Sequence, residues 1–453
     1  MMPARPYQRE AIRKIAAYAA ENPYGRLILV LPTRSGKTFV AAMIVLQMVV
    51  RQGFRALWLV HREELLDEAV RHLIEVGVPR AQVGVIKAGR AANPEAAIQV
   101  ASDATLERRD RPVAHFIVTD EAHRDTSARR RKIRRAYPKA FQLGLTATPK
   151  APHQRDLGED YDAMLVVVQP SELIHDGWLS APTVFAPSAN ARPDLRGVRI
   201  YKGDYHVADL EPRLTRRKLL DDQVREWARL AEGRATIAFP VSRAHSIALV
   251  ERFRAAGIDA HHLEGATPGQ ERRTVLAGLA SGKIPVVSSV GVLIEGTNIP
   301  RVKLAFCLRP TRSLPLWIQS SMRCATPWEG VRPRILDAPG NVFELGFPFS
   351  DRHWSLINAQ SGRVMNGNGK VKRCGVCGAV MPDDAAVCSS CTAVFPEPEV
   401  PDAPAIELHE VTLDEQRREE ERQRLLAYAQ RQRFQDPEGW AARVLRLQHG
   451  AAA

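Results

Sequence analysis

The stretch that most constrains the fold is RLILVLPTRSGKT, residues 26–38. A short apolar run ends in a loop that carries Gly36, Lys37 and Thr38, and a long apolar stretch suited to a buried helix follows. Backbone N–H groups at a turn from a strand into a helix, with the helix N-terminus behind them, form an anion site. In such a loop Lys37 would reach the β- and γ-phosphates of a nucleotide and Thr38 would hold Mg²⁺. The sequence therefore predicts a strand–loop–helix unit that binds a nucleoside triphosphate.

The loop departs from the general phosphate-loop pattern G-x-x-x-x-G-K-[ST] at one fixed position. Leu31 replaces the first glycine, whereas Arg34 falls where the pattern allows any residue. If the backbone at Arg34 needs a positive φ, a side chain there costs roughly 1–2 kcal/mol, which a folded domain tolerates. A guanidinium at this place could also favour a bound triphosphate. The alternative interpretation of the loop is a structural turn without a ligand.

A pair of adjacent carboxylates follows a second apolar strand, in VTDEAH, residues 118–123. At the strand tip Asp120 would bind Mg²⁺, and Glu121 would orient or deprotonate the attacking water. Two acids at a strand end can also be ordinary surface residues. Because they follow the phosphate loop in this order, we expect them to complete a site for nucleotide hydrolysis.

Apolar strands alternate with amphipathic helices along most of the chain, which indicates parallel sheets covered on both faces. A second alternating pattern begins near residue 235 and ends near residue 345. The predicted fold class is α/β, with two tandem parallel-sheet domains, a small zinc ribbon and a helical tail. We expect a first domain at 1–170, a connector at 171–215, a second domain at 216–345, a linker at 346–372, the ribbon at 373–395 and the tail at 405–453.

The order of the motifs resembles that of superfamily 2 helicases and translocases. LPTRSGKT, TDEAH and LTATP are similar to motifs I, II and III of that family. The resemblance continues through RPYQREAI (5–12, the glutamine motif), VHREELLDEA (60–69, motif Ia), ASDATLERR (101–109), FPVSRAHS (239–246, motif IV), SSVGVLIEGTNIP (288–300, motif V) and QSSMR (319–323, motif VI). It covers about residues 1–345. With the cysteine cluster behind it, the chain looks closest to the RadD-like and phage-encoded DEAH branch.

The resemblance implies two RecA-like domains with ATP bound between them. The residues with implied catalytic roles are Lys37, Glu121, Gln319 and Arg323, the last as an arginine that stabilises charge on the γ-phosphate. The residues implied to bind ATP and Mg²⁺ are Arg5, Gln8, Thr33, Arg34, Ser35, Gly36, Lys37, Thr38, Asp120 and Gly296, with Gln8 at the adenine edge. His123, Thr146 and Thr148 would couple the nucleotide to nucleic acid, which Arg62, Thr105 and Ser242 would contact.

Three positions differ from the family pattern. Motif VI usually reads Q-x-x-G-R-x-x-R, but here Met322 stands for the glycine and Thr326 for the second arginine. Motif V usually has an aspartate where this chain has Asn298. Because losing one arginine of this kind costs about 10³-fold or more in rate, these residues raise the alternative of a weakened or inactive ATPase.

Four cysteines predict a metal site. Cys374, Cys377, Cys388 and Cys391 form two C-x₂-C pairs separated by ten residues. Each pair would sit on a tight turn, and four thiolates in tetrahedral geometry favour a closed structural Zn²⁺ site. Free or oxidised thiols, or a redox C-x-x-C, are the alternatives.

The net charge of +13 and the pI of about 9.7 favour a polyanionic partner. The basic run ARRRKIRRAYPK, residues 128–139, would either neutralise phosphates or form a solvated helix face. No apolar run approaches the ~18 residues needed to span a bilayer, and the N-terminus lacks the apolar core of a signal peptide. We therefore expect a cytoplasmic protein of a bacterial or phage-infected cell, with nucleic acid as partner, DNA favoured over RNA.

The leading hypothesis is an ATP-dependent DNA helicase or translocase acting in repair, recombination or replication, and using ATP, Mg²⁺ and Zn²⁺. One alternative is a nucleic-acid-binding protein with a weakened ATPase. Another is the motor subunit of a nuclease or restriction system, and an RNA helicase also fits the motifs. A monomer is favoured, and a protein partner could bind the ribbon or the C-terminal helix.

Overall fold

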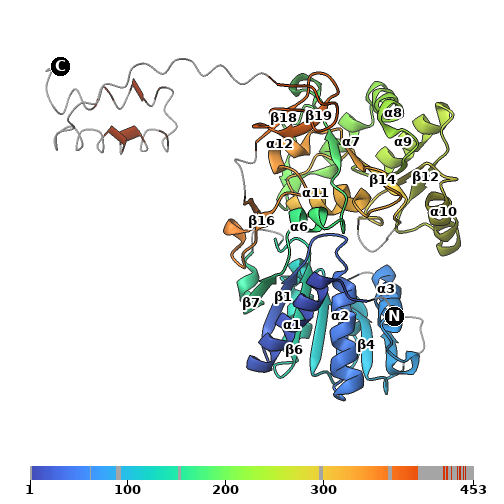
Figure 1. Ribbon diagram of the computed structural model, residues 1–453, viewed down its shortest axis with the longest axis vertical. Coiled ribbons are helices and arrows are strands. Elements are labelled where there is room, and N and C mark those ends of the chain that lie inside the picture. The colour runs from blue at the N-terminus through green and yellow to red at the C-terminus, as the bar shows by residue number, and fades with distance from the viewer. Residues whose placement is uncertain are drawn as a thin grey trace. The chain divides into compact units, whose positions relative to one another are not determined.

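The computed structural model describes residues 3–61, 63–87, 93–151, 155–294, 299–365 and 370–395, together with scattered positions between 422 and 444 (Figure 1). The chain divides into two compact units, residues 1–395 and residues 396–453. Arg62, Gly296 and Asn298 lie outside the described residues, as does most of the predicted helical tail. None of the described helices is both long enough and apolar enough to cross a membrane.

The first domain is built on a seven-stranded sheet in which every strand pair is parallel. The strand order is β3-β4-β2-β5-β6-β1-β7. The strands are β1 (Arg26–Val30), β2 (Ala56–Val60), β3 (Val83–Ile86), β4 (Ile98–Ser102), β5 (Phe116–Asp120), β6 (Phe141–Thr146) and β7 (Ala163–Val166). The helices are α1 (Pro6–Glu21), α2 (Lys37–Val45), α3 (Glu63–Glu75), α4 (Asp103–Leu106) and α5 (Ala128–Arg135).

The strands at the centre of this sheet are buried, as a parallel sheet covered on both faces requires. All five residues of β2 and of β5 are buried, as expected of strands with helices on both faces. In Figure 1, α1 and α2 lie in front of the sheet. Parallel strands bring their carboxyl ends to one edge, so the loops after β1, β5 and β6 gather there.

The second domain is built on an eight-stranded sheet in the order β12-β13-β11-β14-β15-β8-β19-β18. Its strands are β8 (Thr183–Phe185), β11 (Ala235–Phe239), β12 (Ala260–Leu263), β13 (Val286–Ser289), β14 (Val302–Cys307), β15 (Arg334–Asp337), β18 (Val371–Arg373) and β19 (Ala379–Pro382). Its helices are α6 (Pro170–His175), α7 (Val207–Leu214), α8 (Arg217–Ala231), α9 (Arg243–Ala255), α10 (Gly269–Ser281), α11 (Leu314–Ser321) and α12 (Asn341–Leu345). Two short hairpins are β9 (Ile200–Tyr201) with β10 (Asp204–Tyr205), and β16 (Arg352–His353) with β17 (Arg363–Val364).

The predicted fold class is confirmed, with two parallel-sheet α/β domains and a four-cysteine segment behind them. The pairing also shows what the sequence patterns did not. β8, from the predicted connector, pairs in parallel with β15, and β19, from the ribbon, pairs antiparallel with β8. The ribbon thus extends the edge of the second sheet rather than standing apart from it.

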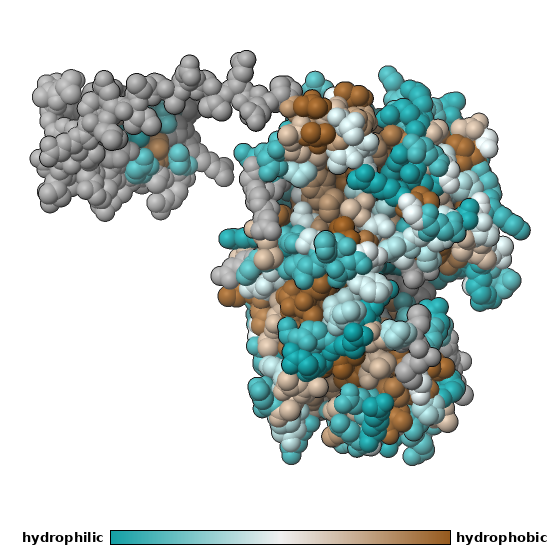
Figure 2. All heavy atoms as spheres, in the orientation of Figure 1, coloured by the Kyte–Doolittle hydropathy of each residue, from teal (hydrophilic) through white to brown (hydrophobic). Residues whose placement is uncertain are grey.

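Figure 2 shows hydrophobic side chains on the surface at the place where Figure 1 has β18 and β19. Three valines of the ribbon, Val376, Val387 and Val394, are exposed, the first and last by more than three-quarters. The region of α8 in the same view is covered mainly by hydrophilic side chains. The ribbon therefore differs from the neighbouring surface in its apolar character.

Candidate nucleotide and metal sites

The loop between β1 and α2 has two left-handed residues in close succession. Gly36 precedes α2 with φ 82°, and Arg34 has φ 72°. A Cβ on Gly36 would lie 2.6 Å from Nε2 of Gln8, so the end of the Gln8 side chain would have to shift, and the positive φ itself favours glycine. Arg34 adopts its φ at a cost of roughly 1–2 kcal/mol. The positive φ considered for Arg34 from the sequence is therefore present.

Two residues of the glutamine motif hydrogen-bond to the main chain of this loop. Gln8 donates from Nε2 to the main-chain oxygen of Ser35 at 2.9 Å, and the hydroxyl of Tyr7 donates to the same oxygen at 2.7 Å. The backbone N of Arg5 donates to Oε1 of Gln8 at 2.9 Å, and the Arg5 guanidinium stacks over Trp178. Tyr7 is a contributor that sequence reasoning missed, although its place next to Gln8 was a usable signal. Reading of an adenine edge by Gln8 stays a prediction.

The carboxylates of TDEAH lie where β5 ends. Glu121 has φ 51°, and its backbone N donates to Oδ1 of Asp120 at 3.0 Å. The Oε2 atom of Glu121 lies 3.3 Å from Nδ1 of His123. It also accepts a hydrogen bond of 3.3 Å from Nε2 of Gln319, which belongs to α11 of the second domain. The two domains therefore meet at the residue expected to activate water.

The predicted coupling residues form a connected chain behind Glu121. Nδ1 of His123 lies 3.1 Å from Oγ1 of Thr146, and that hydroxyl oxygen accepts a hydrogen bond of 3.1 Å from the backbone N of Thr148. All three are buried. Oγ1 of Thr148 is a buried hydroxyl for which the described part of the chain offers no hydrogen-bond partner. The structure thus brings motif II and motif III into direct contact.

The charges at this edge favour a bound metal and an anion. Burial, and then the neighbouring charge of Glu121, raises the pKa of Asp120 to about 7, while Lys37 opposes the shift. Burial lowers the pKa of Lys37, and the carboxylates of Glu121 and Asp120 oppose that shift. A divalent cation would stabilise the ionised form of Asp120. Oxygen donors such as the carboxylate of Asp120 and the hydroxyl of Thr38 suit Mg²⁺, so the residues fit the metal that the motifs imply.

Motif VI lies against the same edge from the second domain. Arg323 is buried in the short 3₁₀ turn Met322–Cys324 that follows α11. Its guanidinium Nε donates to the main-chain oxygen of Ile294 at 2.7 Å. Its main-chain oxygen accepts a hydrogen bond of 3.0 Å from Nη2 of Arg34 in the loop. Thr326 brings no cationic side chain to this place, and its carbonyl accepts a hydrogen bond from the ammonium of Lys303.

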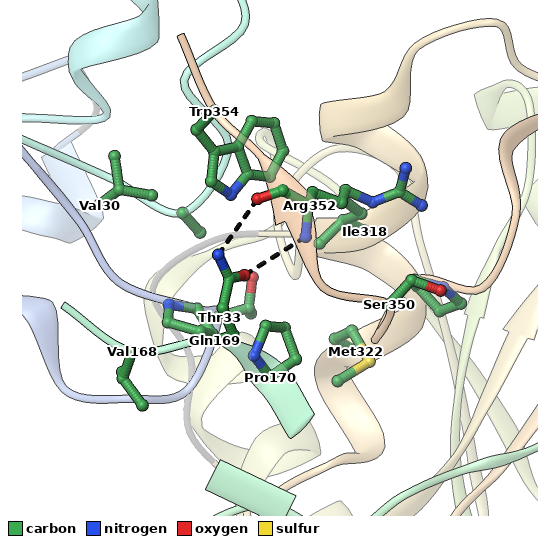
Figure 3. A pocket seen from close by; sticks show the side chains of 13 residues that line it. Val30, Thr33, Val168, Gln169, Pro170, Ile318, Met322, Ser350, Arg352 and Trp354 are labelled. Atoms are coloured by element: carbon green, nitrogen blue, oxygen red, sulfur yellow. Dashed lines mark hydrogen bonds between the residues drawn. The ribbon is translucent and has the colours of Figure 1, made fainter. Parts of the chain in front are cut away.

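A small pocket lies between the phosphate loop and the second domain (Figure 3). Thr33 from the loop and Met322 from motif VI both line it. Gln169 and Arg352 also line the pocket and are joined by two hydrogen bonds. Nε2 of Gln169 donates to the main-chain oxygen of Arg352 at 3.2 Å, and the backbone N of Arg352 donates to Oε1 of Gln169 at 3.3 Å. Arg352 is buried, and its guanidinium donates to three main-chain oxygens, those of Leu345, Phe347 and Gly362. Residues of the predicted linker therefore pack against the loop.

One face of the helix in the basic run 128–139 is buried, whereas Arg129, Lys132 and Arg135 of the same helix are exposed. Arg130 and Arg134 are only 1% and 4% exposed. Arg130 pairs with Asp125 at 2.7 Å and with Asp103 at 3.1 Å, and Arg134 pairs with Asp125 at 3.2 Å. Nη1 of Arg130 also donates to the main-chain oxygen of Asp120 at 2.9 Å. The buried face of α5 therefore contributes two arginines to an ion-pair network, and Arg130 in that network also hydrogen-bonds to motif II at Asp120.

Two of the three predicted nucleic-acid contacts, Thr105 and Ser242, lie within the described residues, and Arg62 lies outside them. Thr105 lies on α4 and is half-buried. The hydroxyl of Ser242 accepts a hydrogen bond of 3.1 Å from the backbone N of His245 and caps α9. A contact of either residue with nucleic acid stays a prediction.

The four cysteines converge on one point. Their sulfur atoms all lie within 4.8 Å of one another. The Sγ atoms of Cys374 and Cys391 are 3.7 Å apart, as are those of Cys377 and Cys388. Four thiolates placed about 2.3 Å from one tetrahedral zinc ion lie about 3.8 Å from each other. The donor set and its spacing therefore fit Zn²⁺.

Comparison with known families finds two matches. Residues 1–151 match the family described as type III restriction enzyme, res subunit, and residues 217–326 match the helicase conserved C-terminal domain. The first matched segment contains β1 to β6 of the first sheet and motifs I to III. The second contains β11 to β14 of the second sheet and motifs IV to VI.

Similar proteins come from phage and yeast. A 51.5 kDa protein of a Lactococcus phage is 29% identical over 364 residues, which cover 80% of this chain and 76% of that protein. A Saccharomyces cerevisiae protein named as a candidate ATP-dependent helicase, IRC3, is 27% identical over 335 residues, covering 70% of this chain. The chain spans only 48% of the length of the yeast protein.

Among solved structures, the ATP-dependent type ISP restriction-modification enzyme LlaBIII bound to DNA superimposes with a TM-score of 0.56 at 18% identity. The superposition covers 75% of this chain and 28% of that one. At this identity the likeness concerns the fold. Together the matches show that the chain carries two RecA-like domains with the superfamily 2 helicase fold, of the kind found in helicase-type ATPases.

Proposed function

We propose that this chain is an ATP-dependent motor that couples ATP hydrolysis to movement on nucleic acid, as a DNA helicase or translocase. The observation that carries the proposal is the 3.3 Å hydrogen bond from Gln319 to Glu121, two residues 198 positions apart that join motif VI to motif II. Such a contact lets the second domain act on the hydrolytic site of the first, which is what a motor with two RecA-like domains requires.

Each residue of the site has a proposed role. Lys37 holds the β- and γ-phosphates, and Glu121 accepts the proton of the attacking water. Asp120 and Thr38 hold Mg²⁺, which when bound neutralises charge on the phosphates. Arg323 stabilises the charge that develops on the γ-phosphoryl group. The contacts from His123 through Thr146 to Thr148 transmit occupancy of this site to the neighbouring surface.

DNA is the favoured track, and Arg62, Thr105 and Ser242 are the proposed contacts. The net charge of +13 supports a polyanionic partner. We further propose action in repair, recombination or replication, in the cytoplasm of a bacterial or phage-infected cell, and the phage relative supports this setting. A motor subunit of a restriction or nuclease system is the second candidate, and the match of residues 1–151 to a restriction-enzyme family favours it.

The test is ATP turnover measured with single-stranded DNA, duplex DNA, forked DNA and RNA, for the wild type and for Lys37→Ala. We expect turnover that nucleic acid stimulates in the wild type and that Lys37→Ala abolishes, because the loop then lacks its phosphate-binding ammonium. Wild-type turnover no higher than that of Lys37→Ala on every substrate would overturn the motor and leave a nucleic-acid-binding protein with an inactive ATPase. The inactive alternative is considered because Met322 and Thr326 replace the glycine and the second arginine of the motif VI pattern.

We also propose that the four cysteines hold one structural Zn²⁺ ion and that the ribbon offers its exposed valines to a protein partner. Elemental analysis is expected to find about one zinc per chain. Cys388→Ser should lose the metal, whereas Cys324→Ser, at a buried cysteine of motif VI, should retain it. Because β19 pairs with β8, loss of zinc should also lower the melting temperature of the second domain. A folded wild type that is free of metal and has four reactive thiols would contradict this site.

A further inference from the structure

Arg34 has a left-handed backbone conformation, which glycine adopts more easily than arginine. Its φ of 72° is in the left-handed region, which costs a residue with a Cβ roughly 1–2 kcal/mol. Glycine adopts this conformation without that cost. Because strain of this kind persists only where the surroundings enforce it and concentrates at functional sites, the contacts of the Arg34 side chain need an explanation.

The side chain of Arg34 reaches from the first domain to the second. Its Nη2 donates to the main-chain oxygen of Arg323 at 3.0 Å, across a sequence separation of 289 residues. Arg323 lies two residues after the end of α11, the helix whose Gln319 contacts Glu121. Arg34 therefore fastens the phosphate loop to the main chain of motif VI, a few residues from the contact that completes the hydrolytic site.

The charges around this contact suit a polyanion. Burial, and then the positive charge of Arg323, lowers the pKa of Arg34 well below its ordinary range, and Glu68 opposes the shift. Burial lowers the pKa of Lys37 most, the carboxylates of Glu121 and Asp120 oppose that shift, and the charges of Arg323 and Arg34 lower the pKa further. Arg34, Lys37 and Arg323 therefore repel one another in a site that also holds two carboxylates. A polyphosphate would remove that repulsion and draw the two domains together.

Motif VI itself lacks the second arginine that its pattern calls for. Thr326 occupies that position, and its carbonyl is held by Lys303. The guanidinium of Arg323 is directed to the main-chain oxygen of Ile294. If this site uses a second guanidinium, it comes from outside motif VI, and Arg34 already lies against motif VI.

We propose that Arg34 is a positioning residue that supplies a second guanidinium to the nucleotide site from the phosphate loop and holds motif VI against that loop when a nucleoside triphosphate is bound. The inference rests on the proposed ATPase function. It makes Arg34 a replacement, in the first domain, for the charge missing at Thr326.

The experiment compares Arg34→Gly, Arg34→Gln and Arg34→Lys with the wild type in the full chain. Arg34→Gly should keep or raise the melting temperature, because the strain is relieved, and yet lower kcat by about 10- to 100-fold. Its affinity for a non-hydrolysable ATP analogue, measured by calorimetry, should fall more than its affinity for ADP. Arg34→Lys should retain more activity than Arg34→Gln, because the charge remains.

Lys202→Gly is the matched control. Lys202 also has a positive φ, of 54°, but it is exposed on the β9–β10 hairpin, so glycine there should leave kcat unchanged. Wild-type kcat and unchanged analogue binding in Arg34→Gly would overturn the inference. Equal losses of ADP and analogue affinity would also overturn it, since they would indicate a general defect of the loop. If the wild type shows no turnover above Lys37→Ala, the proposed function fails, and the comparison of analogue with ADP still decides the role of Arg34.

Discussion

Glu121→Gln is expected to stop ATP hydrolysis while leaving nucleotide binding intact. The amide has nearly the same shape as the carboxylate but cannot accept the proton of the attacking water. Loss of a general base costs about 10²- to 10⁴-fold in rate, so kcat should fall by that factor. Lys37, Thr38 and the loop are untouched, and calorimetry with a non-hydrolysable ATP analogue should therefore give the wild-type affinity.

The matched control for this substitution is Glu68→Gln. Glu68 lies on α3, and its charge acts on both Asp120 and Arg34, but it does not lie at the end of β5. If the general electrostatics of the site set the rate, both substitutions should reduce kcat alike. If Glu121 is the base, Glu68→Gln should hydrolyse ATP at close to the wild-type rate. Hydrolysis by Glu121→Gln at the wild-type rate would show that another group activates the water.

The parts of the site that depend on local sequence could be predicted from it. A glycine and a lysine after an apolar strand, and two carboxylates after another, identify the loop and the carboxyl end of β5, because both the strand and the turn are encoded within about ten residues. The convergence of the four cysteine sulfur atoms could be predicted for the same reason, since each C-x₂-C pair forms its own tight turn. The alternation of strands and helices was enough to predict two parallel sheets.

The parts that depend on distant residues could not be predicted. Arg34 donates to the main-chain oxygen of Arg323, 289 positions away. Neither segment has a local sequence pattern that predicts this contact. The composition of the run at 128–139 does not show which of its arginines are paired, because their acidic partners Asp103, Asp125 and Asp160 come from three other segments. Strand pairing likewise depends on distant residues. The short strands β8 and β19 join the second sheet because β8 pairs with β15 and β19 pairs with β8.

Arg130→Ala is expected to lower the free energy of unfolding by about 3–5 kcal/mol. Removing one member of a buried ion-pair network leaves the remaining charges without compensation, and this costs about that much. Here the carboxylates of Asp125 and Asp103 would lose the guanidinium that lies 2.7 Å and 3.1 Å from them. Urea unfolding of the full chain, followed through the transition of the first domain, measures the change.

Arg135→Ala is the control, because Arg135 is an exposed arginine of the same helix and should change stability by no more than about 0.5 kcal/mol. Asp103→Asn, which removes only one of the acidic partners, should fall between the two and remains measurable if Arg130→Ala does not fold. Equal stability of the Arg130 and Arg135 variants would contradict the buried network. Since Nη1 of Arg130 also donates to the main-chain oxygens of Asp120 and Glu121, a folded Arg130→Ala chain should also hydrolyse ATP more slowly, because the strained turn that presents Glu121 would lose its support.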